Sequence, residues 1–288
     1  MRKELFGLML SDAGGSLRYF AVFQRLSSIM ATDSAVRTVT HPVEAFLTFV
    51  GEGTIILVDT FRRLLKPPVE MGETLHQMAF IGVASVPIVV LTNFFSGAVL
   101  SLYITQFLNQ YGAGNFVGAT VGLAVTREVG PVLAGIMVAA RCGSAMAAQI
   151  GTMAVTEQID ALRMLSVHPT NYLVIPRVVA GFLMMPILAL IGIYAAGLGG
   201  DIVAQLGGVG HATFIQSLQQ YITPWDFIGG ILKTPVFGVI VAIVACQQGL
   251  RTKNGAVGVG NATTNTVVIS MVLIYITNYF LARIIFGA

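Results

Sequence analysis

The chain has 288 residues, of which 55% are hydrophobic and 10% are charged, with a formal net charge of +3. Soluble domains carry about 25% charged residues, so this composition excludes an ordinary soluble protein. Because no soluble core of this length could cover so much apolar surface, we expect an all-α integral membrane protein. The small net charge indicates no nucleic-acid partner.

The first 77 residues contain eight of the sixteen Lys and Arg residues and two amphipathic stretches, Leu17–Met30 and Val43–Leu65. Apolar residues mixed with charges are typical of a helix that lies in the membrane interface. An ordinary cytoplasmic helix is the alternative. The apolar run after the charged start is too short for a signal peptide. We therefore expect residues 1–77 to form a retained arm that is cytoplasmic and interfacial.

Five apolar segments in residues 78–288 are each long enough to cross a bilayer, which needs about 20 residues. They lie at about 78–105, 116–151, 176–200, 228–246 and 266–286. The second apolar region continues to about Val155, and one straight helix of that length would measure about 60 Å. Such a helix must tilt, project beyond the bilayer or break. Gly130-Pro131 is the expected break, because proline removes a helical donor.

The basic residues predict the orientation of these segments. With the N-terminus inside, the cytoplasmic parts hold twelve Lys and Arg residues, whereas the outer loops 106–115 and 201–227 hold none. The positive-inside rule therefore predicts five transmembrane helices with the N-terminus inside and the C-terminus outside. The sequence HATFIQSLQQYI, which begins at His211, predicts a short surface helix in the second outer loop.

Ionisable residues inside the apolar segments are the first candidates for a functional site, because each costs free energy in a membrane. Arg127 and Glu128 are adjacent in the second segment, and Lys233 lies in the fourth. Neighbouring residues on a helix point about 100° apart, so Arg127 and Glu128 cannot neutralise each other on one face. We expect Lys233 to be a partner for Glu128. A structural ion network and a polar part of a substrate route both remain open.

Small residues recur at every fourth position of the second segment. The small-residue stripe consists of Gly135, Ala139, Gly143, Ala147 and Gly151. Such a stripe lets another helix backbone approach closely. The sequence leaves two interpretations open, which are packing within the chain and packing across a dimer axis.

A short polar helix is predicted at Thr156–Leu165, directly after the second segment. Thr156 is expected to cap its first turn, and Glu157 and Asp160 suit the positive end of the helix. Ile159, Leu162 and Leu165 give it an apolar edge. A plain amphipathic connector fits the same residues.

Several kinds of site are missing from the sequence. It contains no phosphate loop and no spacing of Cys or His residues that would hold a metal. Cys142 and Cys246 both fall in apolar segments and are interpreted as buried free thiols. We expect no catalytic residue, no metal and no cofactor bound by this chain.

The run TREVGPVLAGIMVAARCGSAMAAQIGTMAVTEQIDALRML at 126–165 resembles the signature region of MlaE/YrbE-family permeases. The Pro-Arg pair at 176–177, ILKTPVFG at 231–238 and residues 249–268 fit the same pattern. The resemblance covers about residues 70–288. It implies the permease domain of an ABC transporter at 78–288, which moves a lipid, usually a phospholipid, and works with an MCE-domain protein.

The resemblance also implies partners and roles for residues. The partners are cytoplasmic ABC ATPase subunits that bind ATP and Mg²⁺, an MCE-domain protein on the outer face, and a second permease subunit, expected to be a second copy. Residues 156–165 match the coupling helix that contacts the ATPase, through Glu157, Gln158, Ile159, Asp160 and Leu162. Arg127, Glu128, Lys233 and Asn278 match polar positions near the lipid cavity, although some members carry an acid where Asn278 stands.

Two other classes of function remain as alternatives. One is a membrane enzyme that acts on lipid headgroups, with Glu128 as base and Arg127 or Arg141 binding phosphate. The other is a stand-alone channel or secondary transporter, although the internal repeats that are frequent in transporters are absent from this sequence. The resemblance favours a bacterial inner membrane over a chloroplast inner envelope.

Overall fold

The computed structural model describes residues 48–63, 71–165 and 168–287, which are helical and contain no β-strand. The chain divides into two units, 1–52 and 53–288. Of the first unit only 48–52 are described, at the start of a helix that continues to residue 63. This helix falls within the predicted amphipathic stretch Val43–Leu65, whereas Leu17–Met30 lies outside the described residues.

Five helical segments are long and apolar enough to cross a membrane, which confirms the predicted number. They are Met71–Gln110, Gly114–Val155, Thr170–Leu206, Pro224–Leu250 and Gly255–Phe286. Each is longer than its apolar stretch, because helical hydrogen bonding continues into the polar flanks. The first begins at Met71, within the stretch of sequence assigned to the arm.

The segments are built from helices and tighter or wider turns. The first contains α3 (Met71–Ile81), a 3₁₀ turn (Val83–Ser85) and α4 (Val86–Gln110). The second begins with a 3₁₀ turn (Gly114–Phe116) and continues as α5 (Val117–Ala124), a first π-turn (Val125–Val129), α6 (Gly130–Val138), a second π-turn (Ala139–Gly143) and α7 (Ser144–Val155). The third segment contains a third π-turn (Thr170–Val174) and α9 (Ile175–Leu206). The fourth contains α11 (Pro224–Leu232) and α12 (Thr234–Leu250), and the fifth is α13 (Gly255–Phe286).

The predicted break at Gly130-Pro131 is wrong, because the second segment stays helical through this point. The Gly130 N–H donates to the Val125 carbonyl, five residues back, and so closes the first π-turn. Pro131 follows at the start of α6 and has no N–H to donate, and the Arg127 carbonyl, four residues back, accepts a hydrogen bond from Lys233. The second π-turn closes in the same way, from the Ser144 N–H to the Ala139 carbonyl. Widened turns of this kind are frequent at functional sites.

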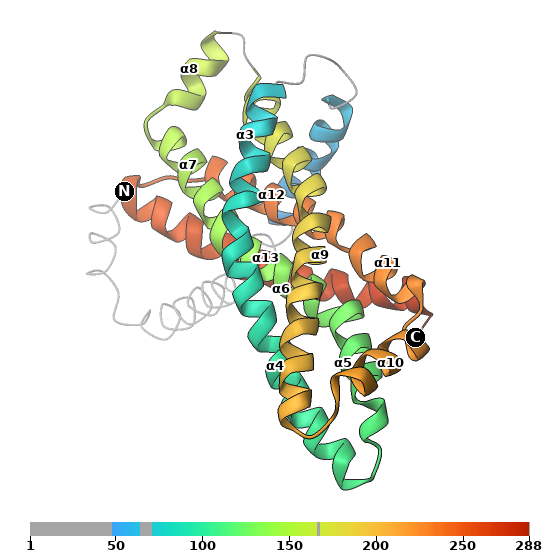
Figure 1. The fold of residues 1–288 in the computed structure, drawn as a ribbon. Coiled ribbons are helices and arrows are strands. Elements are labelled where there is room, and N and C mark those ends of the chain that lie inside the picture. Colours follow the sequence, from blue (N-terminus) through green and yellow to red (C-terminus); the bar gives the residue numbers. More distant parts are fainter. Residues whose placement is uncertain (1–47, 64–70, 166–167, 288) are drawn as a thin grey trace, which may run out of the picture. The chain divides into compact units, whose positions relative to one another are not determined.

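Glycines bring the helices of the second unit close together. Figure 1 shows α4 alongside α9, and these two helices share the most extensive packing in the described structure. A Cβ atom on Gly97 would lie 2.0 Å from the Ala196 carbonyl oxygen, and one on Gly199 would lie 2.1 Å from the Phe94 oxygen. Close backbone approach of this kind is how membrane helices gain packing energy without a hydrophobic driving force.

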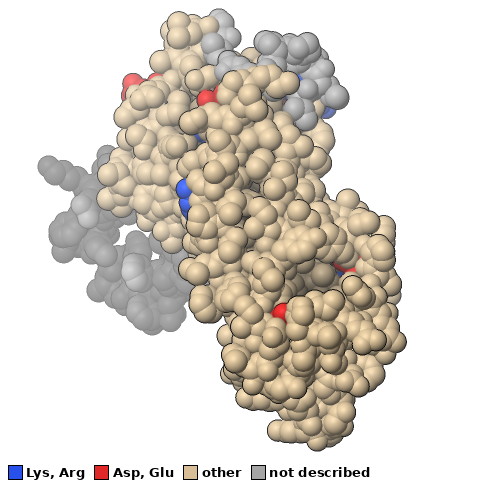
Figure 2. All heavy atoms as spheres, viewed as in Figure 1, with Lys and Arg blue, Asp and Glu red and all other residues tan. Residues whose placement is uncertain are grey.

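Two short helices lie at opposite ends of the bundle in Figure 1, namely α8 (Gln158–Met164) and α10 (His211–Tyr221). The second confirms the surface helix predicted after His211. Between these ends the face in Figure 2 is almost free of charge. Large apolar side chains are exposed along α4 and α13, including Phe95, Val99 and Tyr279. An uncharged apolar belt between two ends is what contact with lipid requires.

The helix at 53–63 is joined to the third segment through Asp59. Its carboxylate pairs with Arg63 at 2.7 Å, one turn further along. Burial raises the pKa of Asp59, but hydrogen bonds from Arg63 and Thr170 together with the nearby positive charge outweigh this effect and lower the pKa. The ionised carboxylate is therefore the form that supports this contact at neutral pH.

Candidate functional site: an intramembrane polar cluster

Five residues form one polar cluster inside the spanning segments: Arg127, Glu128, Asp226, Lys233 and Asn278. Lys233 lies at its centre, at the junction of α11 and α12, and is 0% exposed. Its Nζ donates to the Arg127 carbonyl at 2.7 Å, to Glu128 Oε1 at 2.8 Å and to Asn278 Oδ1 at 3.1 Å. Three acceptors match the three protons of an ammonium group, so this buried cation is fully hydrogen-bonded.

Glu128 confirms the expected pairing with Lys233 and adds a second partner. Its Oε2 accepts a hydrogen bond from Asn278 Nδ2 at 2.5 Å, while its Oε1 takes the lysine. Asn278 therefore donates to the acid and accepts from the base, which an acidic side chain at this position could not do while ionised. The hydrogen-bonded network of Glu128 and Lys233 is therefore complete with the amide side chain of Asn278. Because the Glu128 side chain is 42% exposed, the carboxylate also borders open space.

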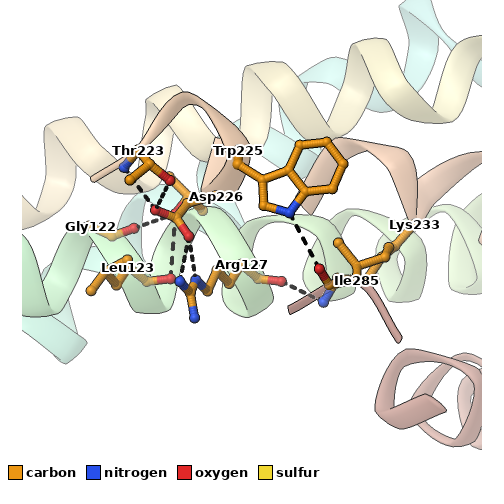
Figure 3. Close-up of polar contacts among 9 residues, drawn as sticks. Gly122, Leu123, Arg127, Thr223, Trp225, Asp226, Lys233 and Ile285 are labelled. Atoms are coloured by element: carbon orange, nitrogen blue, oxygen red, sulfur yellow. Dashed lines mark hydrogen bonds and ion pairs between the residues drawn. The ribbon is translucent and has the colours of Figure 1, made fainter. Parts of the chain in front are cut away.

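Arg127 turns away from Glu128, as the helical angle between neighbours predicts, and meets Asp226 from α11. Its Nε donates to Asp226 Oδ1 at 2.7 Å, and its Nη2 makes a second contact with the same oxygen. Figure 3 shows Thr223 and Arg127 on either side of this carboxylate. The backbone N–H and the hydroxyl of Thr223 donate to Asp226 Oδ2, as in a helix capping box.

Sequence reasoning missed Asp226, which is 99 residues from its arginine. The available signal was Thr223-Pro-Trp-Asp226, a capping pattern that places a carboxylate at the first turn of a helix. That signal predicts the local cap but not the distant Arg127. It could have shown only that an acid begins the fourth segment.

The C-terminal end of α13 covers the cluster with an aromatic ring. The Phe286 ring centroid lies 4.6 Å from Arg127 Cζ and 5.2 Å from Lys233 Nζ. Both distances are within the range of a cation–π interaction. The Trp225 indole N–H also donates to the Ile285 carbonyl, at 3.3 Å, and fixes the same end of α13 to α11 (Figure 3). Phe286 is a second contributor that sequence reasoning missed.

The cluster pairs two cations with two anions, so its formal charge is zero. Burying unpaired charge in low dielectric is costly, and the pairing removes most of that cost. Two of its side chains remain partly open, since Arg127 is 40% and Glu128 42% exposed. The first π-turn thus carries one partly exposed cation and one partly exposed anion on neighbouring residues, whose side chains point in different directions. This arrangement can contact a group that carries both charges or several hydrogen-bonding atoms.

The helix α8 confirms the short helix predicted after the second segment but corrects its details. Thr156 does not cap it: its hydroxyl donates back to the Thr152 carbonyl at the end of α7. Glu157 holds the position before α8 with a positive φ of 59°. Asp160 pairs with Arg163 on the exposed side at 2.8 Å, and Gln158 is exposed as well.

Ile159 corrects a further expectation, because it is only 5% exposed and packs in a cluster of this chain's own residues. It is therefore not free to fill a groove on a partner. Leu162 is partly buried, whereas Met164 and Leu165 are open. The exposed apolar surface of this region therefore lies at the C-terminal end of α8 and just after it.

The small-residue stripe packs within the chain. A Cβ atom on Gly135 would meet Phe237 and Ile274, one on Gly143 would meet Val241 and Thr266, and one on Gly151 would meet Thr252. Ala139 and Ala147 are fully buried. Helices α12 and α13 therefore pack against the small-residue stripe. Of the two interpretations of the stripe, the structure supports packing within the chain.

We expect Gly143→Leu to prevent stable folding and Gly143→Ala to be tolerated with a small loss. A Cβ atom at this position would lie 3.1 Å from Val241 Cγ1, a contact that a small shift can relieve, whereas the longer leucine must displace α12. The thermal transition of the detergent-solubilised protein measures both effects. A leucine variant with the wild-type transition would contradict the packing assigned to the stripe.

The described residues contain no group of three or more His, Cys, Asp or Glu side chains placed to hold a metal. Cys142 and Cys246 are both buried and are not joined in a disulfide. These findings agree with the interpretation of both cysteines as buried thiols. The polar cluster is thus the main concentration of ionisable groups described within the spanning segments.

Comparison with known proteins places this geometry in a family. The family profile described as Permease MlaE matches residues 74–284. A probable ABC transporter permease protein of Rickettsia prowazekii is 43% identical over 250 residues, covering 84% of this chain and 93% of the relative. One from Synechocystis is 41% identical over 227 residues, covering 78% and 86%. Protein TRIGALACTOSYLDIACYLGLYCEROL 1, chloroplastic, of Arabidopsis thaliana is 36% identical over 236 residues, covering 81% and 67%.

Proposed function

Since this chain belongs to the MlaE family of ABC transporter permeases, we propose that it is the membrane subunit of an ATP-driven phospholipid transporter. Family membership over most of the chain is the observation that carries the proposal. The Arabidopsis relative bears the name of a glycolipid, which supports a lipid as the transported class. The ATP is hydrolysed by partner ATPase subunits, and this chain is not itself an enzyme.

The polar cluster has a defined role in this proposal. It forms part of the wall of a lipid cavity between two copies of the permease. The open sides of Arg127 and Glu128 contact the headgroup, while Asp226, Lys233 and Asn278 hold these two side chains in place. An MCE-domain protein receives or delivers the lipid on the outer face. The assembly resides in a bacterial inner membrane, in preference to a chloroplast inner envelope.

The geometry favours a transporter over an enzyme that acts on headgroups. Both carboxylate oxygens of Glu128 already accept hydrogen bonds, from Lys233 and from Asn278. A general base needs a free oxygen within reach of the proton that it removes, and each oxygen of Glu128 already has a donor. Fixed pairing suits a residue that shapes a binding wall. A stand-alone channel remains the other alternative, and an ATPase partner would exclude it.

The free energy of ATP hydrolysis reaches the chain through α8 in this proposal. We expect the double change Glu157→Lys, Asp160→Lys to weaken retention of the ATPase at least about tenfold, since reversed charges at an interface lose pairing and gain repulsion. Both side chains are exposed, so the fold should be unaffected. Affinity purification of the complex, with quantification of bound ATPase and of lipid-stimulated ATP hydrolysis, measures the effect.

A matched control lies at the opposite end of the bundle. Gln216→Lys, Gln220→Lys adds positive charge to the exposed face of α10 and should leave retention and hydrolysis at wild-type levels. If the α8 variant retains ATPase like the wild type, the ATPase docks elsewhere and the role of α8 is refuted. If no ATPase purifies with the wild-type chain, the transporter proposal itself fails.

A further inference from the structure

Arg141 is an arginine inside a spanning segment whose contacts are all neutral. It belongs to the second π-turn, and its Nη1 donates to the Ser85 hydroxyl at 3.2 Å and to the Phe80 carbonyl at 3.3 Å. The same nitrogen lies 3.4 Å from Cys142 Sγ, and the guanidinium lies 5.5 Å from the Phe80 ring centroid. Within the described part of the chain, no carboxylate pairs with Arg141.

The two other arginines away from the segment ends differ from Arg141, and Arg283 lies exposed three residues before the end of the fifth segment. Arg127 has the carboxylate of Asp226, whereas Arg177 has neutral partners but is buried and closed to any ligand. Arg141 is half-buried. Its Nε and Nη2 donate to no described residue and are not among the buried unpartnered atoms, so they reach the surface. An uncompensated cation that reaches the surface at this depth calls for an anion.

The surroundings of Arg141 explain how it is held. Between α3 and α4 the chain makes a 3₁₀ turn, and just before it the Phe80 carbonyl accepts a hydrogen bond from Arg141. One part of the guanidinium is thereby fixed to the turn. Beside it, Val83 is 70% exposed, and Ala84 and Ile88 are also exposed apolar residues.

We propose that Arg141 binds the phosphate of a membrane lipid at this turn, with the lipid's acyl chains against Val83 and Ile88. Two free nitrogens of a planar fork match two phosphate oxygens, a pairing that arginine makes with good geometry. Arg141 follows Arg127 by fourteen residues, about 21 Å along a helix, so this site is separate from the polar cluster. It faces the lipid laterally and does not depend on transport.

The proposed site is tested by comparing how strongly two brominated lipids quench a tryptophan placed at position 83. Trp225 is the only tryptophan, so Trp225→Phe, Val83→Trp places a single fluorophore on the 3₁₀ turn that Arg141 contacts through Ser85. Brominated phosphatidylglycerol is expected to quench this fluorophore with a relative binding constant about tenfold above that of brominated diacylglycerol, which lacks the phosphate. Adding Arg141→Gln should abolish the preference, and Arg141→Lys should keep part of it. Inorganic phosphate at millimolar concentration should leave the quenching unchanged.

Val99→Trp in the same Trp225→Phe background is the matched control, because Val99 is exposed on α4 but lies fourteen residues beyond Ser85. The tryptophan at position 99 should be quenched equally by both lipids. Its quenching should also be the same with and without Arg141→Gln, which would show that the Arg141→Gln variant is folded. Equal quenching at residue 83 by the two lipids would overturn the proposal, as would a preference that survives Arg141→Gln. Displacement by inorganic phosphate would assign the site to a free anion, and no quenching at all would mean that protein covers it.

Discussion

Replacing Lys233 with methionine is expected to lower the free energy of unfolding by about 2–3 kcal/mol. The change removes a fully buried cation and leaves Glu128 Oε1 and the Arg127 carbonyl without their donor. Breaking a buried ion pair on one side costs about 3–5 kcal/mol. We take a smaller value because the Glu128 side chain is 42% exposed and its charge is partly screened.

Unfolding in a denaturing detergent measures this loss, with the fluorescence of Trp225 on α11 as a signal from beside the cluster. The double change Lys233→Met, Glu128→Gln should recover part of the stability, since it removes the unpaired carboxylate as well. Lys253→Met, at an exposed position between α12 and α13, is the control and should be neutral. If Lys233→Met is as stable as this control, the cluster does not stabilise the fold.

The second large effect is expected at Gly199, where alanine should destabilise the protein by about 3 kcal/mol. A Cβ atom there would lie 2.1 Å from the Phe94 carbonyl oxygen, and backbone cannot move aside as the end of a side chain can. Relief requires α4 and α9 to separate along their shared face. Overpacking usually costs 1–3 kcal/mol, and a clash with backbone belongs at the upper end of that range.

Gly197 provides the comparison, because it lies on the same helix and a Cβ atom there would meet nothing within 4 Å. Gly197→Ala should be neutral or stabilising by up to about 1 kcal/mol, since alanine favours the helix. The two thermal transitions, measured in the same detergent, should differ by several degrees. Equal transitions for the two variants would show that α4 and α9 are not in close contact in the protein.

Much of the fold could be predicted from the sequence, because crossing a membrane imposes long uncharged stretches. The uncharged run within Met78–Thr105 and four further apolar stretches, which carry few charges, give the five helices directly. The behaviour of Gly130-Pro131 could not be predicted. Proline signals the loss of a hydrogen bond, but whether the helix breaks or closes a π-turn depends on the packing of its neighbours. The N-in, C-out orientation stays a prediction from basic residues.

The sequence pattern predicted only those residues of the candidate site that are ionisable and lie within apolar segments, because an ionisable group there costs free energy. Glu128 and Lys233 stand out as charges in apolar sequence, and few other charges could pair with them. Asp226 lies at the edge of its segment, where an acid needs no special explanation, and only the fold brings it to Arg127. Ile159 was identified from the sequence, but its contacts were not. An amphipathic pattern indicates that a helix has an apolar side, but not whether that side packs against this chain or against another one.

The second π-turn determines the direction in which the helix below it faces. Residues four apart on an α-helix advance about 400°, so the small-residue stripe from Gly135 to Gly151 would wind about 160° around a uniform helix. The turn at Ala139–Gly143 takes up one residue and turns the helix back by about 100°, which leaves about 60° of winding. This is why Gly135 contacts Phe237 while Gly151 still contacts Thr252 after sixteen residues. If the same residues formed a uniform α-helix without this turn, α7, with α8 at its end, would face about 100° away from its present direction, whereas deleting one residue as the turn becomes regular would restore that direction.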